Sequence, residues 1–295
     1  MLSDSISTWI SRKLESARRA WFKFARNPLS VVGLVIVLGV VLTAIFAPYF
    51  APFPQHAGRY VDFGAASQPP SSTHLFGTDV FGRDILSRIL FGFRFSLTMG
   101  GVVLSLVVVP GVTLGLIAGY LKGHWIDAVI MRITDIFLAI PPLILALAVC
   151  SVLTPSLFNA MMAVSLMWWP WYTRLTYGLA TSLRSEYFVQ AAEVIGAGKP
   201  RILFREILPN CLSPILTKMA LDMGVVIILG SSLSFVGLGV QPPKPGLGTM
   251  VADGAKYLPD LWWIAVFPAL AIILLVMGFN LLGDGIRDLM SLEEV

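Results

Sequence analysis

Residues 29–50 form a long run without a charged side chain, and this run constrains the fold more than any other feature of the sequence. A helix needs about 20 mostly apolar residues to cross the hydrocarbon core of a bilayer. The run is longer than a signal-peptide core and no convincing small-x-small cleavage site follows it, so we expect a retained helix. Of the 295 residues, 56% are hydrophobic and only 13% are charged, and the mean hydropathy is +0.80. Soluble chains have about 25% charged residues, so the sequence indicates an integral membrane protein.

Further apolar segments are long enough to cross a bilayer. They cover residues 96–121, 133–153, 157–179, 214–240 and 261–282. Together with 29–50 they predict an all-α protein with six transmembrane helices and a single membrane-embedded unit. The fourth of the six is the least regular, because Pro170 and Arg174 interrupt it.

The distribution of Lys and Arg predicts the orientation, because inner segments of membrane proteins carry an excess of basic residues. With the amino terminus inside, fifteen of the 21 basic residues fall in inner segments and six in outer ones. Both termini are therefore expected in the cytoplasm. Three of the outer six, Arg83, Arg88 and Arg94, lie next to the second span and depart from the rule locally.

The segments outside the spans have distinct compositions. Residues 1–28 have apolar and basic side chains at helical spacing, which predicts an amphipathic helix on the inner leaflet. Residues 51–95 are predicted as an external loop, with turn residues concentrated in its first part, and residues 285–295 as a cytoplasmic tail. The net charge is +4, but the basic residues are dispersed, whereas nucleic-acid binding needs a concentrated basic face. We therefore expect lipid, and not nucleic acid, as a partner.

The longest predicted inner loop, residues 181–213, contains an Ala pair, two spaced glycines and two prolines. Ser185 is predicted to cap a helix that has Glu186 in its first turn and Phe188, Ala192 and Ile195 on one face. Gly196 is expected to end this helix in a left-handed conformation, and Pro200 to start a second helix. Pro209 and Pro214 would then turn the chain into the fifth span. The residues alone favour an ordinary amphipathic connector over a docking surface for a soluble partner.

This loop resembles the cytoplasmic signature E-A-A-x3-G-x9-I-x-L-P of bacterial ATP-binding-cassette (ABC) importer permeases. The matching positions are Ala191, Ala192, Gly196, Leu208 and Pro209. Gln190 stands where the signature has Glu, and Glu206 where it has Ile. We therefore assign no salt bridge to position 190.

Three other motifs extend the resemblance over residues 21–290, namely HLFGTDVFGRDILSRILFGFRFSL at 74–97, LSFVGLGVQPP at 233–243 and NLLGDGIRDL at 280–289. They are similar to the second permease subunit of dipeptide, oligopeptide and nickel importers. The loop after QPP departs from the commonest relatives, since Gly246 and Leu247 precede Gly248 where an acidic residue and a Trp are usual. The resemblance implies a type I ABC importer permease fold in a bacterial inner membrane, with a five-helix core at 96–284.

The resemblance also implies partners and a site. The partners are a homologous permease, two cytoplasmic ABC ATPases and an external solute-binding protein. ATPase coupling is expected at Glu186, Phe188, Gln190, Ala191, Ala192, Glu193, Gly196, Leu208 and Pro209. The chain itself lacks a phosphate-binding loop: in EVIGAGKP, Glu193 replaces the first Gly and Pro200 the Ser or Thr that would hold magnesium. ATP and Mg²⁺ are therefore expected on the partner ATPases, and this chain is expected to be no enzyme and to bind no cofactor.

Candidate pathway residues are fewer. Charged groups within spans are costly and often functional, so Asp222 either lines the pathway or bonds to a neighbouring helix. Ser231, Ser232 and Ser234 make one face of the fifth span polar, although small residues also allow close helix packing. Asp135 is predicted to pair with Arg132 on one helical face. The scattered His56, His74 and His124, and the isolated Cys150 and Cys211, indicate no metal site.

Two alternatives remain open. The same machinery could import nickel or another small solute such as glutathione, since cargo preference is expected mainly in the binding protein. A secondary transporter would instead have inverted repeats, broken helices and several intramembrane acids, of which the sequence shows only hints. A structural scaffold would need neither the outer signature nor the Ala–Gly–Pro loop.

Overall fold

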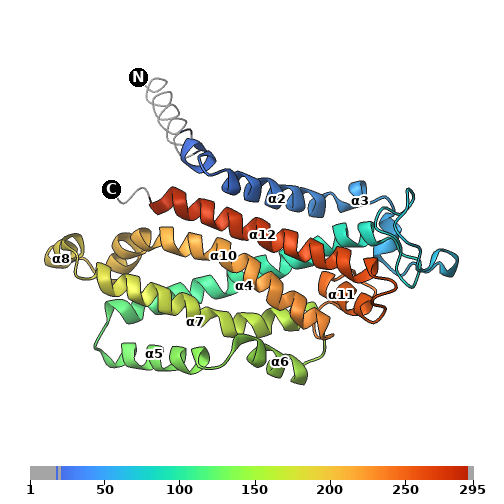
Figure 1. The fold of residues 1–295 in the computed structure, drawn as a ribbon. Helices are drawn as coiled ribbons and strands as arrows, with labels where there is room; N and C mark the ends of the chain where they lie inside the picture. Colours follow the sequence, from blue (N-terminus) through green and yellow to red (C-terminus); the bar gives the residue numbers. More distant parts are fainter. Residues whose placement is uncertain (1–17, 19–20, 292–295) are drawn as a thin grey trace.

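The computed structural model describes residue 18 and residues 21–291. Within them the chain is helical, with two short 3-10 helices and one isolated bridge between Thr78 and Asp84. In chain order the α-helices are α2 (Pro28–Ile45), α3 (Ala47–Phe50), α4 (Ile85–Tyr120), α5 (Trp125–Leu138), α6 (Pro142–Val152), α7 (Leu157–Leu183), α8 (Tyr187–Val194), α9 (Lys199–Arg201), α10 (Leu208–Phe235), α11 (Leu247–Ala255) and α12 (Trp263–Ser291). The long helices lie side by side in a bundle (Figure 1). The amphipathic helix expected at 1–28 falls largely outside the described residues.

Four of the described helices are long and apolar enough to cross a membrane, and a bent pair raises the number to five. The four are Pro28–Ile45, Ile85–Tyr120, Lys199–Phe235 and Trp263–Met290. The 27-residue helix α7 is not among them, and its Trp, Tyr, Thr and Arg residues explain why. The all-helical architecture is confirmed, while the count of six spans stays a prediction.

The prediction of one continuous helix at 133–153 is wrong. The structure has α5 and α6 there, meeting at an angle of 85°. The break follows from Pro141 and Pro142: a proline disfavours the helical conformation of the residue before it and cannot donate a backbone hydrogen bond. Pro141 itself is extended, with φ −56° and ψ 127°. The partner of Asp135 also differs from the prediction, because its carboxylate contacts Arg174 of α7 rather than Arg132.

The first predicted span is broken near its end. The side chain of Asn27 caps α2 by accepting a hydrogen bond from the Leu29 amide, and the helix begins at Pro28. The helix stops at Ile45, and the separate turn α3 follows with Pro48 in it. The guanidinium of Arg94 donates to the carbonyls of Ala44 and Ile45. This arginine thereby satisfies backbone groups at a helix end that lipid could not hydrogen-bond.

The predicted loop at 51–95 is shorter in the structure, because α4 begins at Ile85 rather than at residue 96. Asp84 caps it: its Oδ2 accepts hydrogen bonds from the Ser87 amide at 2.8 Å and the Ser87 hydroxyl at 2.7 Å. Asp is among the preferred N-cap residues, so it favours a helix start at this position. The Arg and apolar residues that follow it have the spacing of a helix. The result is a helix of 36 residues, which is about 54 Å long.

Close packing of α4 on α7 forms the centre of the bundle. Gly111, Gly115 and Gly119 lie at four-residue spacing on one face of α4 and approach the backbone of α7. A Cβ added at Gly115 would lie 2.5 Å from the carbonyl oxygen of Thr173. Small residues at this spacing let two membrane helices approach closely. The larger of the two hydrophobic clusters, which includes Tyr172, is built around this contact.

The fifth predicted span also begins earlier than expected. Helix α9, a π-helical segment at Ile202–Ile207 and α10 join into one continuous helix, Lys199–Phe235. Pro209 and Pro214 therefore lie within this helix and do not turn the chain, since proline is tolerated where its missing N–H leaves only a local gap in the ladder. The last predicted span, 261–282, is observed as α12, which continues to Ser291 into the predicted tail.

The bundle has two distinct ends (Figure 1). Helix α8, the start of α2 and the end of α12 lie at one end, where the Asn27 side chain donates to Asp288 at 3.1 Å. The opposite end is covered by residues 51–84 together with α11, which we call the cap. The two parts with resemblance motifs, the loop at 181–213 and the segment at 74–97, thus lie at opposite ends.

Candidate functional site

Helix α8 starts one residue later than its predicted cap. Glu186 is the N-cap residue, with extended backbone angles of −74° and 147° and no side-chain cap bond. Ser185, the predicted cap, instead donates its hydroxyl to the Ser182 carbonyl at 2.8 Å and so ends α7. The connection from α7 to α8 is therefore a tight turn.

The residues expected on one face of α8 differ in burial. Val189 and Ala192 are buried and belong to the same hydrophobic cluster as Ile202 and Leu203. Phe188 and Ile195, expected to share one face with Ala192, are exposed. The residues that pack on the bundle are thus three apart on the helix, the spacing of neighbours on one face.

The outward surface of α8 is apolar. The most exposed large side chains are Tyr187 at 86%, Val194 at 87% and Ile195 at 80%, and Ala191 is exposed beside them. Helix α8 lies at the end of the bundle, beyond the ends of α7 and α10 (Figure 1). A cluster of exposed apolar side chains at such a place marks a surface for another protein.

Gln190, the departure from the signature, has a specific contact within the loop. Its side-chain amide donates to the carbonyl oxygen of Ser185 at 3.0 Å. A carboxylate cannot make this bond, because it has no proton to donate. The Gln therefore fastens the turn before α8, and no partner charge is needed to explain it.

The end of α8 follows the prediction. Gly196 has a φ of +79°, a left-handed conformation that side chains with a Cβ rarely adopt. The amides of Gly196 and Ala197 donate to the carbonyls of Glu193 and Ala192, each at 3.0 Å. This is the Schellman pattern of helix termination. A Cβ at Gly196 would meet no atom within 4 Å in this chain, so the glycine is required by backbone conformation here and not by close packing.

The π-helical segment joins α9 to α10. The Leu208 amide donates to the carbonyl of Leu203, five residues earlier, and the Asn210 side chain donates to the Glu206 carbonyl at 2.6 Å. Pro209 lacks the N–H that a regular ladder would need here, so the wider turn and the Asn210 amide rearrange the bonding around it. Leu208 and Pro209, both in the signature, thus mark the point where the irregular helix becomes regular.

One contact of α8 was not predicted. The hydroxyl of Tyr120, the last residue of α4, donates to Oε1 of Glu193 at 2.8 Å. The guanidinium of Arg184, at the end of α7, lies 5.6 Å from the centre of the Tyr120 ring. Tyr120 and Glu193 are 73 residues apart in the sequence, so no local pattern predicts that they form a pair.

Asp222 bonds to neighbouring side chains. Its carboxylate accepts from the indole N–H of Trp168 at 2.9 Å and from the ammonium of Lys218 at 3.1 Å. Lys218 also lies over the rings of Trp171 and Tyr172. The carboxylate is buried and borders a cavity of about 370 Å³. Asp222 therefore bonds to the neighbouring helix α7 and also borders a cavity.

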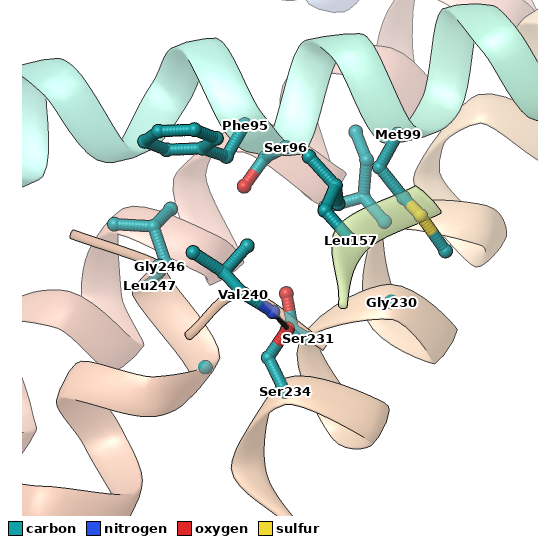
Figure 2. Close-up of a pocket in the computed structure, with 12 residues that line it drawn as sticks. Phe95, Ser96, Met99, Leu157, Gly230, Ser231, Ser234, Val240, Gly246 and Leu247 are labelled. Carbon is teal, nitrogen blue, oxygen red and sulfur yellow. Dashed lines mark hydrogen bonds between the residues drawn. The ribbon is translucent and has the colours of Figure 1, made fainter. Parts of the chain in front are cut away.

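The candidate serines lie near the other end of α10. Ser231 and Ser234 border a cavity whose opposite wall is formed by Phe95, Ser96 and Met99 of α4 (Figure 2). Ser234 accepts a hydrogen bond from the Val240 amide at 3.3 Å, and Ser232 donates to the carbonyl of Ile228 at 2.9 Å. The cavity holds about 20 Å³, which is the room of roughly one water molecule. Asp222 borders a different cavity, so the four candidate pathway residues do not form one site within this chain.

The segment after LSFVGLGVQPP packs directly on this serine face. A Cβ at Gly248 would come within 2.1 Å of the carbonyl oxygen of Ser231. Only glycine fits at such a distance. The loop that departs from the commonest relatives therefore closes the cap end of the cavity.

The cap contains a buried polar network instead of a metal site. His74 Nδ1 contacts Asp84 Oδ1 at 2.9 Å, and His56 Nδ1 accepts the Asp84 amide at 2.9 Å. Arg83 pairs with Asp79 at 2.7 Å, and Arg88 lies 3.6 Å from the same carboxylate. Arg83 and Arg88, which weakened the charge rule at the outer side, thus share one buried carboxylate within the protein. Among the described residues no group of three or more His, Cys, Asp or Glu side chains could hold a metal ion.

Comparison with known proteins gives the class. Residues 111–291 match the family model described as binding-protein-dependent transport system inner membrane component. Residues 17–70 match the N-terminal transmembrane domain of oligopeptide transport permease C. The chain belongs to the family of binding-protein-dependent transport system inner membrane components, and it is a multi-pass permease subunit of an ABC importer and not an enzyme.

Individual relatives are similar over nearly their whole length. The dipeptide transport system permease protein of Alkalihalophilus pseudofirmus is 42% identical over 92% of this chain and 88% of the relative. The probable D,D-dipeptide transport system permease protein of Escherichia coli K12 is 42% identical over 99% and 97%. The glutathione transport system permease protein of Pectobacterium atrosepticum is 40% identical over 92% and 89%.

Proposed function

We propose that this chain is one of two permease subunits through which an ATP-driven importer takes up dipeptides or short oligopeptides. Relatives at about 42% identity are named as dipeptide permeases, and a relative at 40% is named for glutathione, which is itself a modified tripeptide. A peptide cargo is common to both names. Nickel, the other alternative, has no such support among these relatives.

The observation that carries the coupling part of the proposal is the exposed apolar face of α8. Helix α8 is held by Val189 and Ala192 on one side and presents Tyr187, Val194 and Ile195 on the other. In our proposal this face docks into one of two cytoplasmic ABC ATPases, and those two subunits bind ATP and Mg²⁺. The coupling residues are Glu186, Phe188, Gln190, Ala191, Ala192, Glu193, Gly196, Leu208 and Pro209. Both termini then lie in the cytoplasm with α8, and the cap faces the solute-binding protein.

The pathway is proposed to lie between two permeases. The cavity beside Ser231 and Ser234 holds about 20 Å³, far less than a dipeptide occupies, so this chain alone offers no passage at that level. A homologous second permease would supply the opposite wall. ATP binding would draw the ATPases together, move α8, and through Pro209 and α10 switch the paired permeases from inward-open to outward-open. Ser231, Ser232 and Ser234 are the candidate lining groups, whereas Asp222 is proposed to fix α10 to α7.

The cargo is tested by reconstituting the complete importer in liposomes and measuring uptake of a labelled dipeptide with its binding protein outside. We expect uptake that requires hydrolysable ATP and that unlabelled di- and tripeptides compete away, while glutathione competes weakly and nickel not at all. Replacement of ATP by a non-hydrolysable analogue is the matched control. Uptake driven by an ion gradient without ATP would assign a secondary transporter instead. Competition by nickel alone would overturn the peptide cargo.

A further inference from the structure

The attachment of α8 to the rest of the chain carries a further inference, which rests on the proposed function. The helix has eight residues, too few to be stable alone in water. It is followed by the turn at Gly196–Gly198, whose glycines give the backbone wide freedom. Val189 and Ala192 also pack α8 on the cluster that contains Ile202 and Leu203, and a tight turn joins it to α7. Apolar packing is not directional, so a second, directional attachment to a long helix would define the direction in which α8 moves its neighbours.

The second attachment is the hydrogen bond from Tyr120 to Glu193. Among the described residues it is the only side-chain hydrogen bond between α8 and a long helix of the bundle. The Tyr120 ring is buried, with 7% exposure, while its hydroxyl reaches the carboxylate at 2.8 Å. Hydrogen bonds to an ionised acceptor are shorter and about twice as strong as neutral ones. The bond thus fixes the carboxyl-terminal half of α8 to the end of α4.

Arg184 completes the arrangement from α7. Its guanidinium lies over the Tyr120 ring at 5.6 Å and donates to the Lys122 carbonyl at 3.5 Å. A cation over the ring face is attracted by the ring electrons. The ends of α4, α7 and α8 therefore meet at one phenol ring.

Movement at this point would reach the middle of the bundle. Helix α4 is continuous for 36 residues from Tyr120 to the cap, and its glycine face packs on α7 without space for a methyl group. Closely packed helices shift as bodies and not as deformable rods. A pull on Tyr120 therefore displaces α4 and α7 together, whereas the route through Pro209 displaces α10.

We propose that Tyr120 is a positioning residue of the importer, which ties α8 to α4 and makes α4 and α7 follow the ATPases during each cycle. Arg184 holds the ring of Tyr120 in the orientation that reaches Glu193. Coupling then runs along two routes, one through Tyr120 into α4 and one through Pro209 into α10.

The test uses the complete importer in liposomes and measures peptide molecules taken up per ATP hydrolysed, normalised to assembled complex. Tyr120→Phe removes only the hydroxyl, and we expect this ratio to fall about tenfold, the size expected from one charge-assisted hydrogen bond. Glu193→Ala should give the same fall, Glu193→Gln an intermediate one, and the double variant Tyr120→Phe/Glu193→Ala no more than either alone. Tyr177→Phe is the matched control, since this half-buried phenol on α7 has no hydrogen bond within the described part of the chain.

A purely structural role would lower the amount of assembled complex and leave the ratio of uptake to hydrolysis unchanged. That result for Tyr120→Phe, or additive losses in the double variant, would overturn the proposal. The wild-type importer separates this failure from failure of the proposed function. If wild-type complex shows ATP-dependent peptide uptake and Tyr120→Phe matches it, only the role of Tyr120 is wrong.

Discussion

The side chain of His56 shows how a single residue holds the cap on the bundle. Its Nδ1 accepts the Asp84 amide, and its own carbonyl accepts from Arg88 at 3.2 Å. The ring is stacked between Phe53 and Tyr60, with centroids at 5.0 and 4.0 Å. Only the imidazole with an unprotonated Nδ1 can accept the Asp84 amide, so the cap depends on the protonation state of this histidine.

Burial lowers the pKa of His56 below its ordinary value of 6.5, and the neighbouring His74 acts in the same direction, although Asp84 opposes them. Below about pH 6.5 the unfolded chain then binds a proton that the folded chain resists. We therefore expect thermal stability in detergent to be full above that pH and to fall as the pH decreases toward 5.5. His56→Gln, which offers an acceptor oxygen and does not titrate, should show a smaller fall. An equal fall in the variant and the wild type would exclude His56 as the cause.

Among the contacts between helices, the one between α4 and α7 restricts the sequence most, because it leaves no room for a Cβ at three positions of α4. Gly111, Gly115 and Gly119 could be recognised in the sequence as small residues at four-residue spacing, but nothing in the sequence identified α7 as the helix they meet. Elsewhere, too, features set by the local sequence could be predicted, and contacts between distant residues could not. Gly196 predicted the end of α8 correctly because its signal is local, while the contacts of Tyr120 and Arg174 were missed because their partners are far along the chain. The two prolines, Pro141 and Pro142, signal a helix break in the sequence. We nevertheless predicted one continuous span, because the run around them is apolar.

The packing of α4 on α7 is tested by placing a methyl group at Gly115. A Cβ there would lie 2.5 Å from the Thr173 carbonyl and 2.8 Å from the Thr176 Cβ. Overpacking of a close contact typically costs about 1–3 kcal/mol. We expect Gly115→Ala to lower the unfolding midpoint in detergent by an amount of this order. Gly101→Ala, on the same helix with nothing within 4 Å of the added atom, should be neutral or slightly stabilising. If both variants behave alike, the close contact does not exist.

At the scale of the whole molecule, the two ends of the bundle have different surfaces. The end with α8 presents apolar side chains and ends in a glycine turn, and the cap end is closed by buried ion pairs and by Gly248 packed on Ser231. Hydropathy and charge were sufficient to predict a helical membrane protein, and the loop signature identified the segment that we propose for coupling. They did not show which face of α8 is buried, since neighbouring residues on a helix point about 100° apart and several of its faces are apolar.

The central claim is that the end of the bundle with α8 docks on the ATPases. Tyr187 on α8 and Tyr49 on α3 form a matched pair for its test, because they are 86% and 84% exposed and lie at opposite ends. A photo-reactive amino acid is placed at either position in the assembled importer, and the crosslinked partner is identified by mass spectrometry. We predict that position 187 captures an ATPase subunit and position 49 does not. Capture of an ATPase from position 49, with none from position 187, would contradict the account.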